Sequence, residues 1–290
     1  MNNLIIIGAR GFGREVYNLF LDCYKDDREW SCKGYLDSKS DALDGYKGYP
    51  PILCSPEDYV IDKDDVFVCA LGDVKWKKYY VDLMSDKGAS FVSLIHPTAK
   101  VSMNTTFGPG CIITANVLLS CDVYVGKFVT IMRNAVLGHD CKVNDWSHLG
   151  AFTFFGGFSE IGRLCTVHPG AQILPHKKVK DNAVVGAGSV VILTVKEGTT
   201  VMGIPAKKWI IRNKKMEIKD FIEKFAETIE VEDSSVLTVE TKFRELSEWS
   251  SLSVMLLIAF YDEEFEREIG DRDIKVCTTI NDLYLLAMAK

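Results

Sequence analysis

The 290-residue sequence has no long apolar run, no C-x-x-C cysteine pair and no recognisable leader. No stretch approaches the ~18 apolar residues of a membrane-spanning helix, so we expect no membrane partner. The apolar start "LIIIG" is too short for a signal peptide and is broken by Gly8 and Arg10. Nine cysteines without zinc-site spacing or a small disulfide framework indicate a reducing, cytoplasmic location and no metal site.

Charge is distributed unevenly along the chain. Residues 217–290 contain 8 Lys and Arg against 18 Asp and Glu, a net of −10, whereas the first 216 residues contain 26 against 22, a net of +4. A mildly basic body joined to a strongly acidic tail predicts two modules that attract each other. We expect no nucleic-acid partner.

A six-residue repeat dominates the middle of the chain. From Ile95 to Val191 every sixth residue is apolar, which makes seventeen positions in one frame, and a small residue follows four places later except at Lys177. This period fits neither an α-helix nor a hairpin sheet but fits a β-solenoid with 18 residues per coil. Glycine often follows the apolar residue, as at Gly138, where we expect it to relieve backbone strain at the turn.

The hexads resemble the left-handed parallel β-helix of hexapeptide acyltransferases. The closing "GIPAKKW" (203–209) resembles the usual end of that helix. The resemblance implies a β-helix acyltransferase domain over residues 93–212.

Residues 18 apart lie on adjacent coils, so His139 should lie one coil from Gly157. Acyl transfer from a thioester needs a base for the acceptor, which His139 can supply, and a donor for the carbonyl oxygen, which the Gly157 N–H can supply. Asp140 can orient the imidazole. Cys141 falls at an inward corner and is expected to be a buried structural thiol. The alternative for His139 is a surface histidine at a turn.

The stretch "GHDCKVNDWSHLG" (138–150) resembles the active site of nucleotide-sugar acetyltransferases such as the bacillosamine N-acetyltransferases and sialic-acid O-acetyltransferases. The resemblance covers residues 3 to about 210. It implies that His139 is the general base, that Asp140 is its partner and that His148 and the Gly157 N–H contact the acyl donor. It also implies a homotrimer with active sites between neighbouring solenoids. Met132 departs from this pattern, because the family usually has Asn there, near the acceptor sugar.

The N-terminal stretch "NLIIIGARGFGREVYNLF" predicts a buried strand, a glycine-rich turn with Gly8, Gly11 and Gly13, and then a helix. Such a turn lets backbone amides approach a phosphate. Residues 1–92 resemble the short Rossmann-like α/β domain of the same family, which holds the UDP part of the acceptor. The resemblance implies that the turn and Arg14 lie near the phosphates and Asp37 near the nucleoside. A purely structural module is the alternative.

Residues 217–290 predict an all-α bundle. Apolar residues at helical spacing begin at Ile218. A second helix covers 251–265, with Leu252, Met255, Leu256 and Ala259 facing inward, and "TTINDLYLLAMA" opens with a Thr/Asn capping signal.

The stretch "FRELSEWSSLSVMLLIAFYDEEF" (243–265) resembles an acyl carrier protein. Ser251 matches the serine that carries 4'-phosphopantetheine, although Ser250 replaces the usual aspartate. The alternative is a helical tail in which Ser250 only caps the helix.

Together the three domains predict an enzyme that moves an acyl group from a thioester, on the fused carrier or on acyl-CoA, to the amino group of a UDP-linked sugar. One alternative is an O-acetyltransferase that uses acetyl-CoA with an idle carrier. Another is a non-catalytic trimeric scaffold that displays carrier domains.

Overall fold

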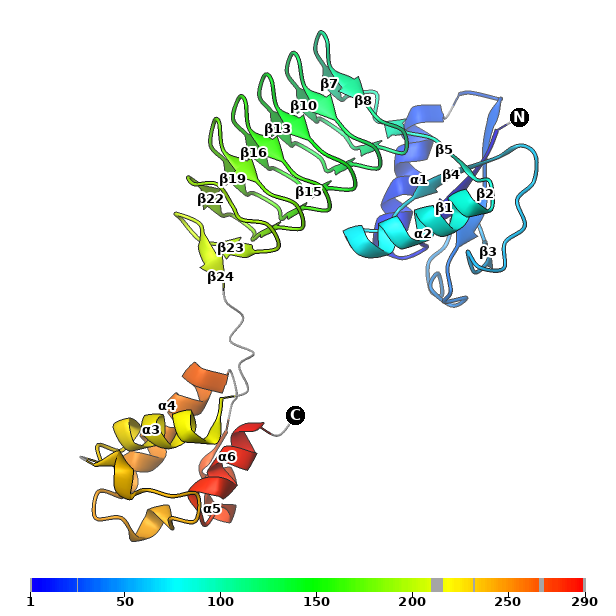
Figure 1. Cartoon of the computed structure of the whole chain (residues 1–290). Coiled ribbons are helices and arrows are strands. Elements are labelled where there is room, and N and C mark those ends of the chain that lie inside the picture. Colours follow the sequence, from blue (N-terminus) through cyan, green and yellow to red (C-terminus); the bar gives the residue numbers. More distant parts are fainter. Residues whose placement is uncertain (1, 25, 210–215, 232, 266–268, 289–290) are drawn as a thin grey trace. The chain divides into compact units, whose positions relative to one another are not determined.

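The computed structural model describes residues 2–24, 26–209, 216–231, 233–265 and 269–288, and only the backbone of Ser235, Ser251, Asp262 and Glu263. The chain forms two compact units, residues 1–210 and 211–290. The first unit contains an α/β domain and a solenoid, and the second is a small helical unit (Figure 1).

The α/β domain is a five-stranded parallel sheet in the order β3-β2-β1-β4-β5. Its elements in chain order are β1 (Asn2–Ile7), α1 (Gly11–Tyr24), β2 (Trp30–Leu36), β3 (Ile52–Cys54), β4 (Asp65–Cys69), α2 (Val74–Asp86) and β5 (Ser90–Phe91). From β1 the chain crosses to β2 on one side and later returns to β4 on the other. The strand order therefore reverses between β1 and β4, where ligands of such sheets usually bind.

Alternation along β1 explains why one helix covers each face of the sheet. Leu4 and Ile6 are buried in the same apolar cluster as α1, whereas Ile5 and Ile7 are buried in the cluster that contains Val81 of α2. A strand that is buried on both faces reads as a continuous apolar run, as "LIII" does.

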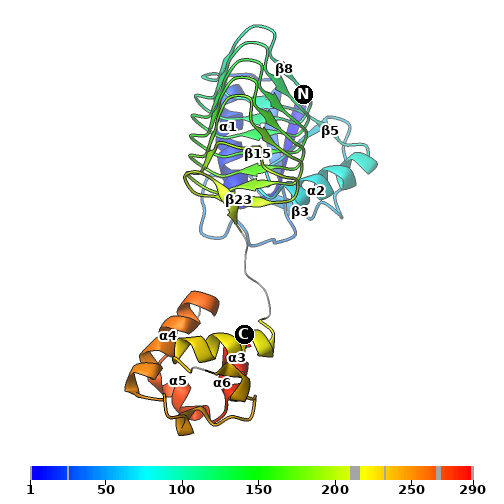
Figure 2. The same ribbon diagram turned by 60° about the vertical axis from the view of Figure 1, so that its left-hand side comes forward.

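The solenoid consists of three parallel sheets, here called the β7, β8 and β6 sheets (Figures 1 and 2). Within residues 94–191 each paired strand lies 18 residues from its partner, as Leu119 does from Leu137, whereas the last parallel pair, Val184 with Thr200, is 16 apart. The β7 sheet contains β7 (Lys100–Val101), β10 (Leu118–Leu119), β13 (Val136–Leu137), β16 (Phe154–Phe155), β19 (Gln172–Ile173) and β22 (Val190–Val191). The β8 sheet contains β8 (Thr106–Phe107), β11 (Tyr124–Val125), β14 (Lys142–Val143), β17 (Glu160–Ile161) and β20 (Lys178–Val179).

The β6 sheet is the longest of the three. It contains β6 (Leu94–Ile95), β9 (Ile112–Ile113), β12 (Thr130–Ile131), β15 (His148–Leu149), β18 (Thr166–Val167), β21 (Val184–Val185), β23 (Thr200–Met202) and the antiparallel β24 (Lys207–Trp209). The apolar residues of the hexads form one continuous buried core from Cys111 to Val201.

The glycines of the hexads do not have the role that the sequence predicts. Positive φ angles fall two residues later in the repeat, for example at Asn134 (59°) and Asp140 (58°). The glycines have no positive φ but lie against the next coil: a Cβ at Gly138 would be 2.8 Å from the Gly157 nitrogen, and one at Gly162 would be 2.5 Å from the Asp181 nitrogen. The prediction of strain relief is wrong, because close stacking of coils selects glycine there.

The first coils of the solenoid pack against the α/β domain. Phe128 and Trp146 stack with ring centroids 4.5 Å apart and share an apolar cluster with α2. From α2, the buried Lys77 side chain reaches the solenoid, where its Nζ donates a hydrogen bond to Thr130 Oγ1 at 2.7 Å. Burial lowers the pKa of Lys77 to about 8. These contacts fix the β6 sheet against the α/β domain.

The C-terminal unit contains four α-helices within the described ranges. They are α3 (Ile218–Thr228), α4 (Ser251–Phe265), α5 (Asp271–Val276) and α6 (Ile280–Met288), with short 3-10 turns η1 (Ser234–Val236) and η2 (Phe243–Glu245). Phe221, Phe225, Leu257 and Leu283 are in its core. The capping prediction for the last helix is confirmed, since the Asp282 carboxylate accepts hydrogen bonds from the Thr278 and Thr279 amides at 2.8 Å.

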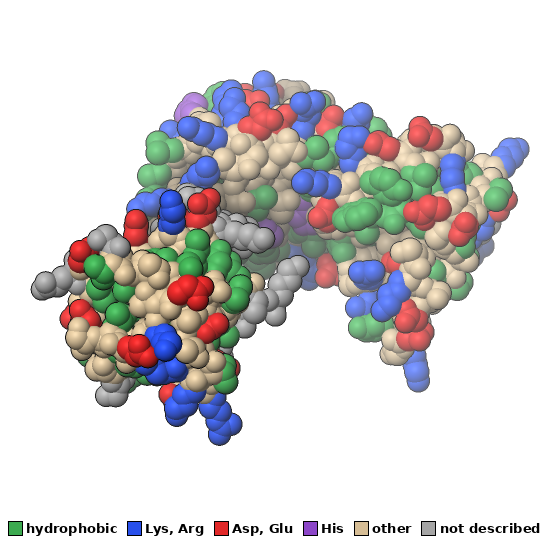
Figure 3. All heavy atoms as spheres, turned by 60° about the horizontal axis from the view of Figure 1, so that its bottom comes forward, with side chains coloured by type: hydrophobic (Ala, Val, Ile, Leu, Met, Phe, Trp, Pro, Cys, Tyr) green, Lys and Arg blue, Asp and Glu red, His purple; other side chains and the backbone are tan. Residues whose placement is uncertain are grey.

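The inward face predicted for α4 is wrong. Leu252 and Met255 are 60% and 68% exposed, and Ala259 is also exposed. Ser253, Leu257 and Tyr261 are buried instead. On the face of this unit seen in Figure 3, hydrophobic side chains lie among acidic ones.

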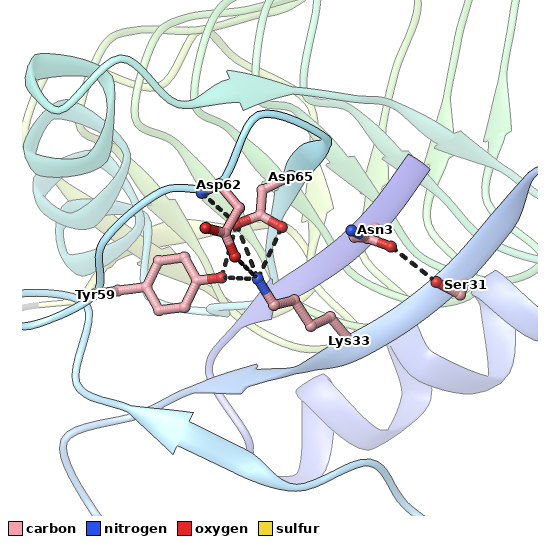
Figure 4. Close-up of polar contacts among 6 residues, drawn as sticks. All are labelled: Asn3, Ser31, Lys33, Tyr59, Asp62 and Asp65. Carbon is pink, nitrogen blue, oxygen red and sulfur yellow. Dashed lines mark hydrogen bonds and ion pairs between the residues drawn. The ribbon is translucent and has the colours of Figure 1, made fainter. Parts of the chain in front are cut away.

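An ionic cluster around the buried Asp65 lies between β2 and the start of β4 (Figure 4). Lys33 Nζ lies 2.6 Å from Asp62 Oδ2 and 3.1 Å from Asp65 Oδ1, and Tyr59 Oη donates to Asp65 Oδ2 at 2.7 Å. Burial by itself would raise the pKa of Asp65, but hydrogen bonds from Tyr59, the Asp62 amide and Lys33 together lower it.

We predict that Asp65→Asn destabilises the protein by about 3 kcal/mol at pH 7, because it leaves the Lys33 cation with one less buried partner. A carboxyl whose folded pKa is lowered contributes stability above its unfolded pKa and loses it as pH falls through the folded value. The difference between variant and wild type should therefore shrink below pH 4 in urea unfolding followed by circular dichroism. Asp62→Asn is the control, since the Asp62 side chain is 70% exposed and its pair should contribute under about 1 kcal/mol. Equal losses in both variants would contradict this account.

Candidate active site

His139 lies at the corner where β13 leads into β14, between the β7 and β8 sheets. The 18-residue coil places Cys121 and Gly157 at the same turn position one coil before and one coil after it. The next turn position carries Asp140 and, one coil later, Phe158. The predicted stacking of His139 and Gly157 is present.

The His139 imidazole is held by its neighbour in the chain. Its Nδ1 lies 2.8 Å from Asp140 Oδ2. The two side chains are 54% and 42% exposed, so a ligand can reach the ring. Asp140 has φ = 58°, a backbone angle that Asp tolerates better than most residues. With Nδ1 as the hydrogen-bond donor to the carboxylate, Nε2 carries the lone pair that can accept a proton.

The Nε2 atom lies against Gly157. A Cβ at position 157 would be 2.7 Å from Nε2, so only glycine leaves room for the imidazole in this position. The ring and the glycine backbone therefore form one small surface.

The Gly157 amide is open, as described amides at this hexad position are unless an aspartate lies one coil later. At the same turn position the Lys127 amide donates to Asp145 Oδ1 at 3.0 Å and the Arg163 amide to Asp181 Oδ1 at 2.9 Å, each 18 residues on. The residue 18 places after Gly157 is Pro175, which has no side-chain acceptor. Within the described part of the chain the Gly157 amide has no acceptor, so it is free to bind an oxygen of a ligand.

Cys141 is buried, and its Sγ lies 3.2 Å from the Gly156 carbonyl oxygen and 3.3 Å from Ser159 Oγ. Burial raises the pKa of its thiol. Such a thiol is a poor nucleophile at neutral pH. The chemistry of this corner therefore depends on the histidine.

His148 lies elsewhere, on β15 of the β6 sheet, which faces the α/β domain. Phe12 packs edge-on against it with ring centroids 6.1 Å apart. Its Nδ1 is buried and has no hydrogen-bond partner among the described residues. Burial, with the nearby Lys77 charge and His168, lowers the pKa of His148 to about 3, so the ring is neutral at physiological pH.

A cavity of about 470 Å³ opens at the carboxyl ends of β1, β2 and β4. Its lining includes Gly8 and Asp37 from the predicted set. The other lining residues are Ile7, Arg10, Phe12, Leu36, Ser38, Pro56, Ala70, Leu71, Gly72, Asp73, Trp76 and Tyr80. It lies where the strand order reverses, the usual position for a nucleotide in such a sheet.

Asp37 supports the walls of this cavity. Its two carboxylate oxygens accept hydrogen bonds from the Ala9 and Lys39 amides, both at 2.9 Å. It joins the glycine-rich turn to the end of β2, and its remaining lone pairs are available to a ligand.

The three glycines of the turn have different roles. Gly8 has φ = 97°, which only glycine adopts readily. A Cβ at Gly13 would overlap the Gly8 carbonyl oxygen, so Gly13 allows α1 to pack against β1. A Cβ at Gly11 would meet nothing closer than an Arg14 nitrogen at 4.0 Å, so Gly11 leaves open space at the start of α1. Gly11 is the position where a phosphate can approach the backbone.

Arg14 lines a second, adjoining hollow. Its guanidinium carbon lies 3.4 Å from the centre of the Tyr46 ring, a cation–π contact. Arg10, Gly11, Lys39 and Asp41 also line this hollow of about 470 Å³. Arg10 belongs to both hollows, so a ligand that extends from one into the other meets positive charge.

A single chain does not bring all the predicted site residues together. His139 lies at the corner between the β7 and β8 sheets, whereas His148 and the α/β domain lie at the β6 sheet. No sequence motif pointed to Lys77, Trp76, Tyr80 or Phe158. A buried lysine and exposed aromatics on a helix give no distinctive spacing.

The side chain of Ser251 lies outside the described residues, so the predicted attachment site stays a prediction. Of the helices in the described ranges, none combines the length and apolar character needed to cross a membrane. The same ranges hold no group of three or more His, Cys, Asp or Glu residues placed to bind a metal ion.

Comparisons with known proteins agree with this architecture. The PglD N-terminal domain family matches residues 3–84. GDP-perosamine N-acetyltransferase of Escherichia coli O157:H7 is 27% identical over 218 residues, which are 70% of this chain and 84% of that protein. A serine acetyltransferase of Staphylococcus epidermidis is 31% identical over 111 residues, 38% of this chain and 46% of that protein.

Solved structures show the same fold. PerB from Caulobacter crescentus, in complex with CoA and GDP-perosamine, has a TM-score of 0.65 at 25% identity and covers 72% of this chain and 98% of its own. The acetyltransferase domain of PglB from Neisseria gonorrhoeae FA1090, with acetyl coenzyme A, has a TM-score of 0.65 at 23% identity and covers 72% and 100%. The Rossmann-like domain and the solenoid of left-handed β-helix type are confirmed, and so is the acyltransferase class.

We predict that His148→Gln makes the protein less sensitive to acid. A histidine whose folded pKa is lowered binds a proton in the unfolded chain first, so stability falls as pH falls from about 6.5 toward 3. Between pH 7 and 4.5 this should remove roughly 2 kcal/mol from wild type but not from the variant. Urea midpoints at the two pH values measure it, and parallel losses in both proteins would contradict the buried neutral ring.

Proposed function

We propose that this enzyme transfers an acyl group from a thioester to the amino group of a nucleotide-linked amino sugar. The observation that carries the proposal is the His139–Asp140 pair beside the open Gly157 amide. The cavity at the end of the parallel sheet supplies a place for the nucleotide. Relatives that N-acetylate GDP-perosamine, and a neighbour solved with acetyl coenzyme A, support both halves of the reaction.

The geometry performs the reaction in two proton transfers. The acceptor amine attacks the thioester carbonyl carbon while His139 Nε2 takes a proton from the nitrogen. The carbonyl oxygen becomes negative and accepts a hydrogen bond from the Gly157 amide. The carbon–sulfur bond then breaks, and the imidazolium returns its proton to the leaving thiolate. The products are an amide and a free thiol, and Asp140 stabilises the charged ring between the two steps.

The acceptor binds through its nucleotide. Phosphates approach the backbone at Gly11 beside Arg10 and Arg14, and the rings of Trp76 and Tyr80 at the cavity wall offer faces for stacking a base. The sequence resemblance favours a UDP-linked sugar, whereas one relative acts on a GDP-linked one. Parallel assays with UDP- and GDP-linked amino sugars decide between the two nucleotides.

The proposed active site is shared between copies of the chain. His139 lies at the corner between the β7 and β8 sheets, whereas the described contacts with the α/β domain come from the β6 sheet and from turns such as Phe128 and Trp146 that lead into it. The adjoining face of the β7 sheet has an apolar stripe that includes Leu118 (36% exposed), Val136 and Phe154 (42% exposed). Packing of this face against a second solenoid in a trimer would bring His139 to the cavity of the neighbouring copy.

The C-terminal unit is proposed to be a carrier that brings the acyl group on a phosphopantetheine attached to Ser251. The exposed Leu252 and Met255 follow that serine on α4, so an apolar docking face lies beside the attachment point. The net charge of −10 in residues 217–290 complements the mildly basic body. A tethered donor reaches an effective concentration in the millimolar range. His148 is proposed to contact the donor.

We predict that His139→Ala reduces the turnover number for acetyl-CoA and the amino sugar at least about 100-fold, because the general base is lost. Gly157→Ala should have a similar effect, because its Cβ displaces the imidazole. Release of CoA thiol measures both. Alanine already occupies the equivalent turn positions 151 and 187, so the fold should tolerate the second change. Undiminished transfer by His139→Ala would contradict His139 as the base, and absence of transfer by the wild-type protein would favour the non-catalytic scaffold.

The shared site predicts complementation between two inactive variants. Gly11→Trp fills the open space at the phosphate approach, and His139→Ala removes the base. A random mixture of co-expressed chains should regain roughly a quarter of wild-type activity and isolated mixed trimers roughly a third, since one of their three sites is complete, while each variant alone stays inactive. No recovery in mixed trimers isolated with two affinity tags would place the complete site within one chain.

We predict that co-expression with a phosphopantetheinyl transferase adds the mass of one phosphopantetheine to the protein. Ser251→Ala should abolish the gain and Ser250→Ala should retain it, because only Ser251 matches the modified serine. The loaded carrier should then compete with acetyl-CoA as donor at equal concentration. A chain that stays unmodified but acetylates from acetyl-CoA would have an idle carrier domain.

A further inference from the structure

Fifteen turn residues of the solenoid, spaced by six from position 104 to 188, have positive φ. Nine of them are Asn, Asp or Gly, the residues that adopt this conformation most easily. Three others, Phe128, Trp146 and Leu164, pack against the α/β domain. The remaining three are Phe152, Phe158 and His176, which are exposed.

Two unfavourable features coincide in Phe158, as they do in Phe152, but of the two only Phe158 has described ring contacts with histidines. Its φ of 60° is strained for a bulky aromatic residue, and its side chain is 49% exposed, so core burial does not compensate. Strained residues that survive without a packing reason are concentrated at functional sites. The contacts of Phe158 therefore show what the strain maintains.

Two imidazoles clamp the Phe158 ring. It meets His139 edge-on, with centroids 5.2 Å apart and an interplanar angle of 89°. It stacks on His176 with centroids 5.0 Å apart and an angle of 5°. Its amide donates to the His139 carbonyl oxygen at 3.0 Å, and the His176 amide donates to the Gly157 carbonyl oxygen at 3.0 Å. The backbone thus fixes all three rings in one column.

The His139 ring is limited on three sides. Asp140 holds Nδ1, the Gly157 backbone lies against Nε2, and Phe158 packs against the ring. The hydrogen bond to Asp140 alone would still allow the imidazole ring to rotate about Nδ1. The contact with Phe158 blocks that rotation.

We propose that Phe158 is a positioning residue that holds the His139 Nε2 over Gly157, with His176 as its support. The proposal rests on the proposed function for the role of His139. It adds that the enzyme maintains a strained turn in order to keep its base aligned. A glycine or asparagine at position 158 would relax the turn and lose the alignment.

The test is Phe158→Gly, with Phe158→Tyr as the conservative variant. Phe158→Gly should raise the melting temperature by a few degrees, because the turn relaxes. It should also lower kcat roughly tenfold with KM for both substrates unchanged, since misalignment of a base affects the chemical step. Phe158→Tyr should restore kcat. Phe152→Gly, at an exposed turn with φ = 59°, calibrates the stability gain.

A second measurement does not depend on activity. The chain has only five histidines, so the His139 imidazole can be assigned in ¹⁵N-histidine NMR spectra by its loss in His139→Ala. Wild type and Phe158→Tyr should show one ring orientation, and Phe158→Gly an averaged one. An unchanged His139 signal in Phe158→Gly, with or without catalysis, would overturn the positioning role. A wild-type enzyme that is inactive on every acceptor while the NMR difference holds would overturn the proposed function alone.

Discussion

The 18-residue closure of each coil is the constraint on which the rest of the molecule depends. It places residues i and i+18 in parallel register, so a local sequence difference becomes a contact between coils. Where the later residue is Asp145 or Asp181, its carboxylate binds the amide of the preceding coil. Where it is Pro175, the amide of Gly157 stays open. Coil stacking therefore decides whether an amide at this turn position, such as that of Gly157, is paired or free to donate to a ligand.

The sequence predicts the parts of this structure that depend on a period. Seventeen apolar residues in one frame fix the register of the coils, and the glycine-rich turn after an apolar run fixes the first strand and helix. The sequence period does not show which structural constraint requires a given residue type at a given position. The hexad glycines look like turn residues, yet their φ angles are not positive and the neighbouring coil selects them. The α4 prediction fails for a related reason: "SVMLLIAFY" is apolar all round, so spacing alone cannot identify its buried face.

In the candidate site, too, some features follow from the sequence period and others depend on tertiary packing. The pairing of His139 with Gly157 follows from counting residues, and their mutual geometry agrees with it. Which corner of the solenoid faces the α/β domain depends on tertiary packing by Phe128, Trp146 and Lys77, and no local pattern encodes it. That packing separates His139 from the nucleotide cavity within one chain. Under the proposed function a complete site would therefore need a neighbouring copy of the chain, because His139 and the nucleotide cavity lie on different sides of one solenoid.

His148 and His139 are held in place in different ways, His148 by burial and His139 by contacts with neighbouring residues. His148 lies against the α/β domain, where burial keeps its ring neutral and its buried Nδ1 has no hydrogen-bond partner among the described residues. His139 is half exposed and gains its orientation from Asp140, Gly157 and Phe158. In the proposed function His139 is the general base, which must meet both substrates and so cannot be fixed by burial. An exposed base needs neighbours that restrict its rotation without covering its Nε2. A bulky ring in a left-handed turn does so, because the turn directs it along the coil stack toward the imidazole.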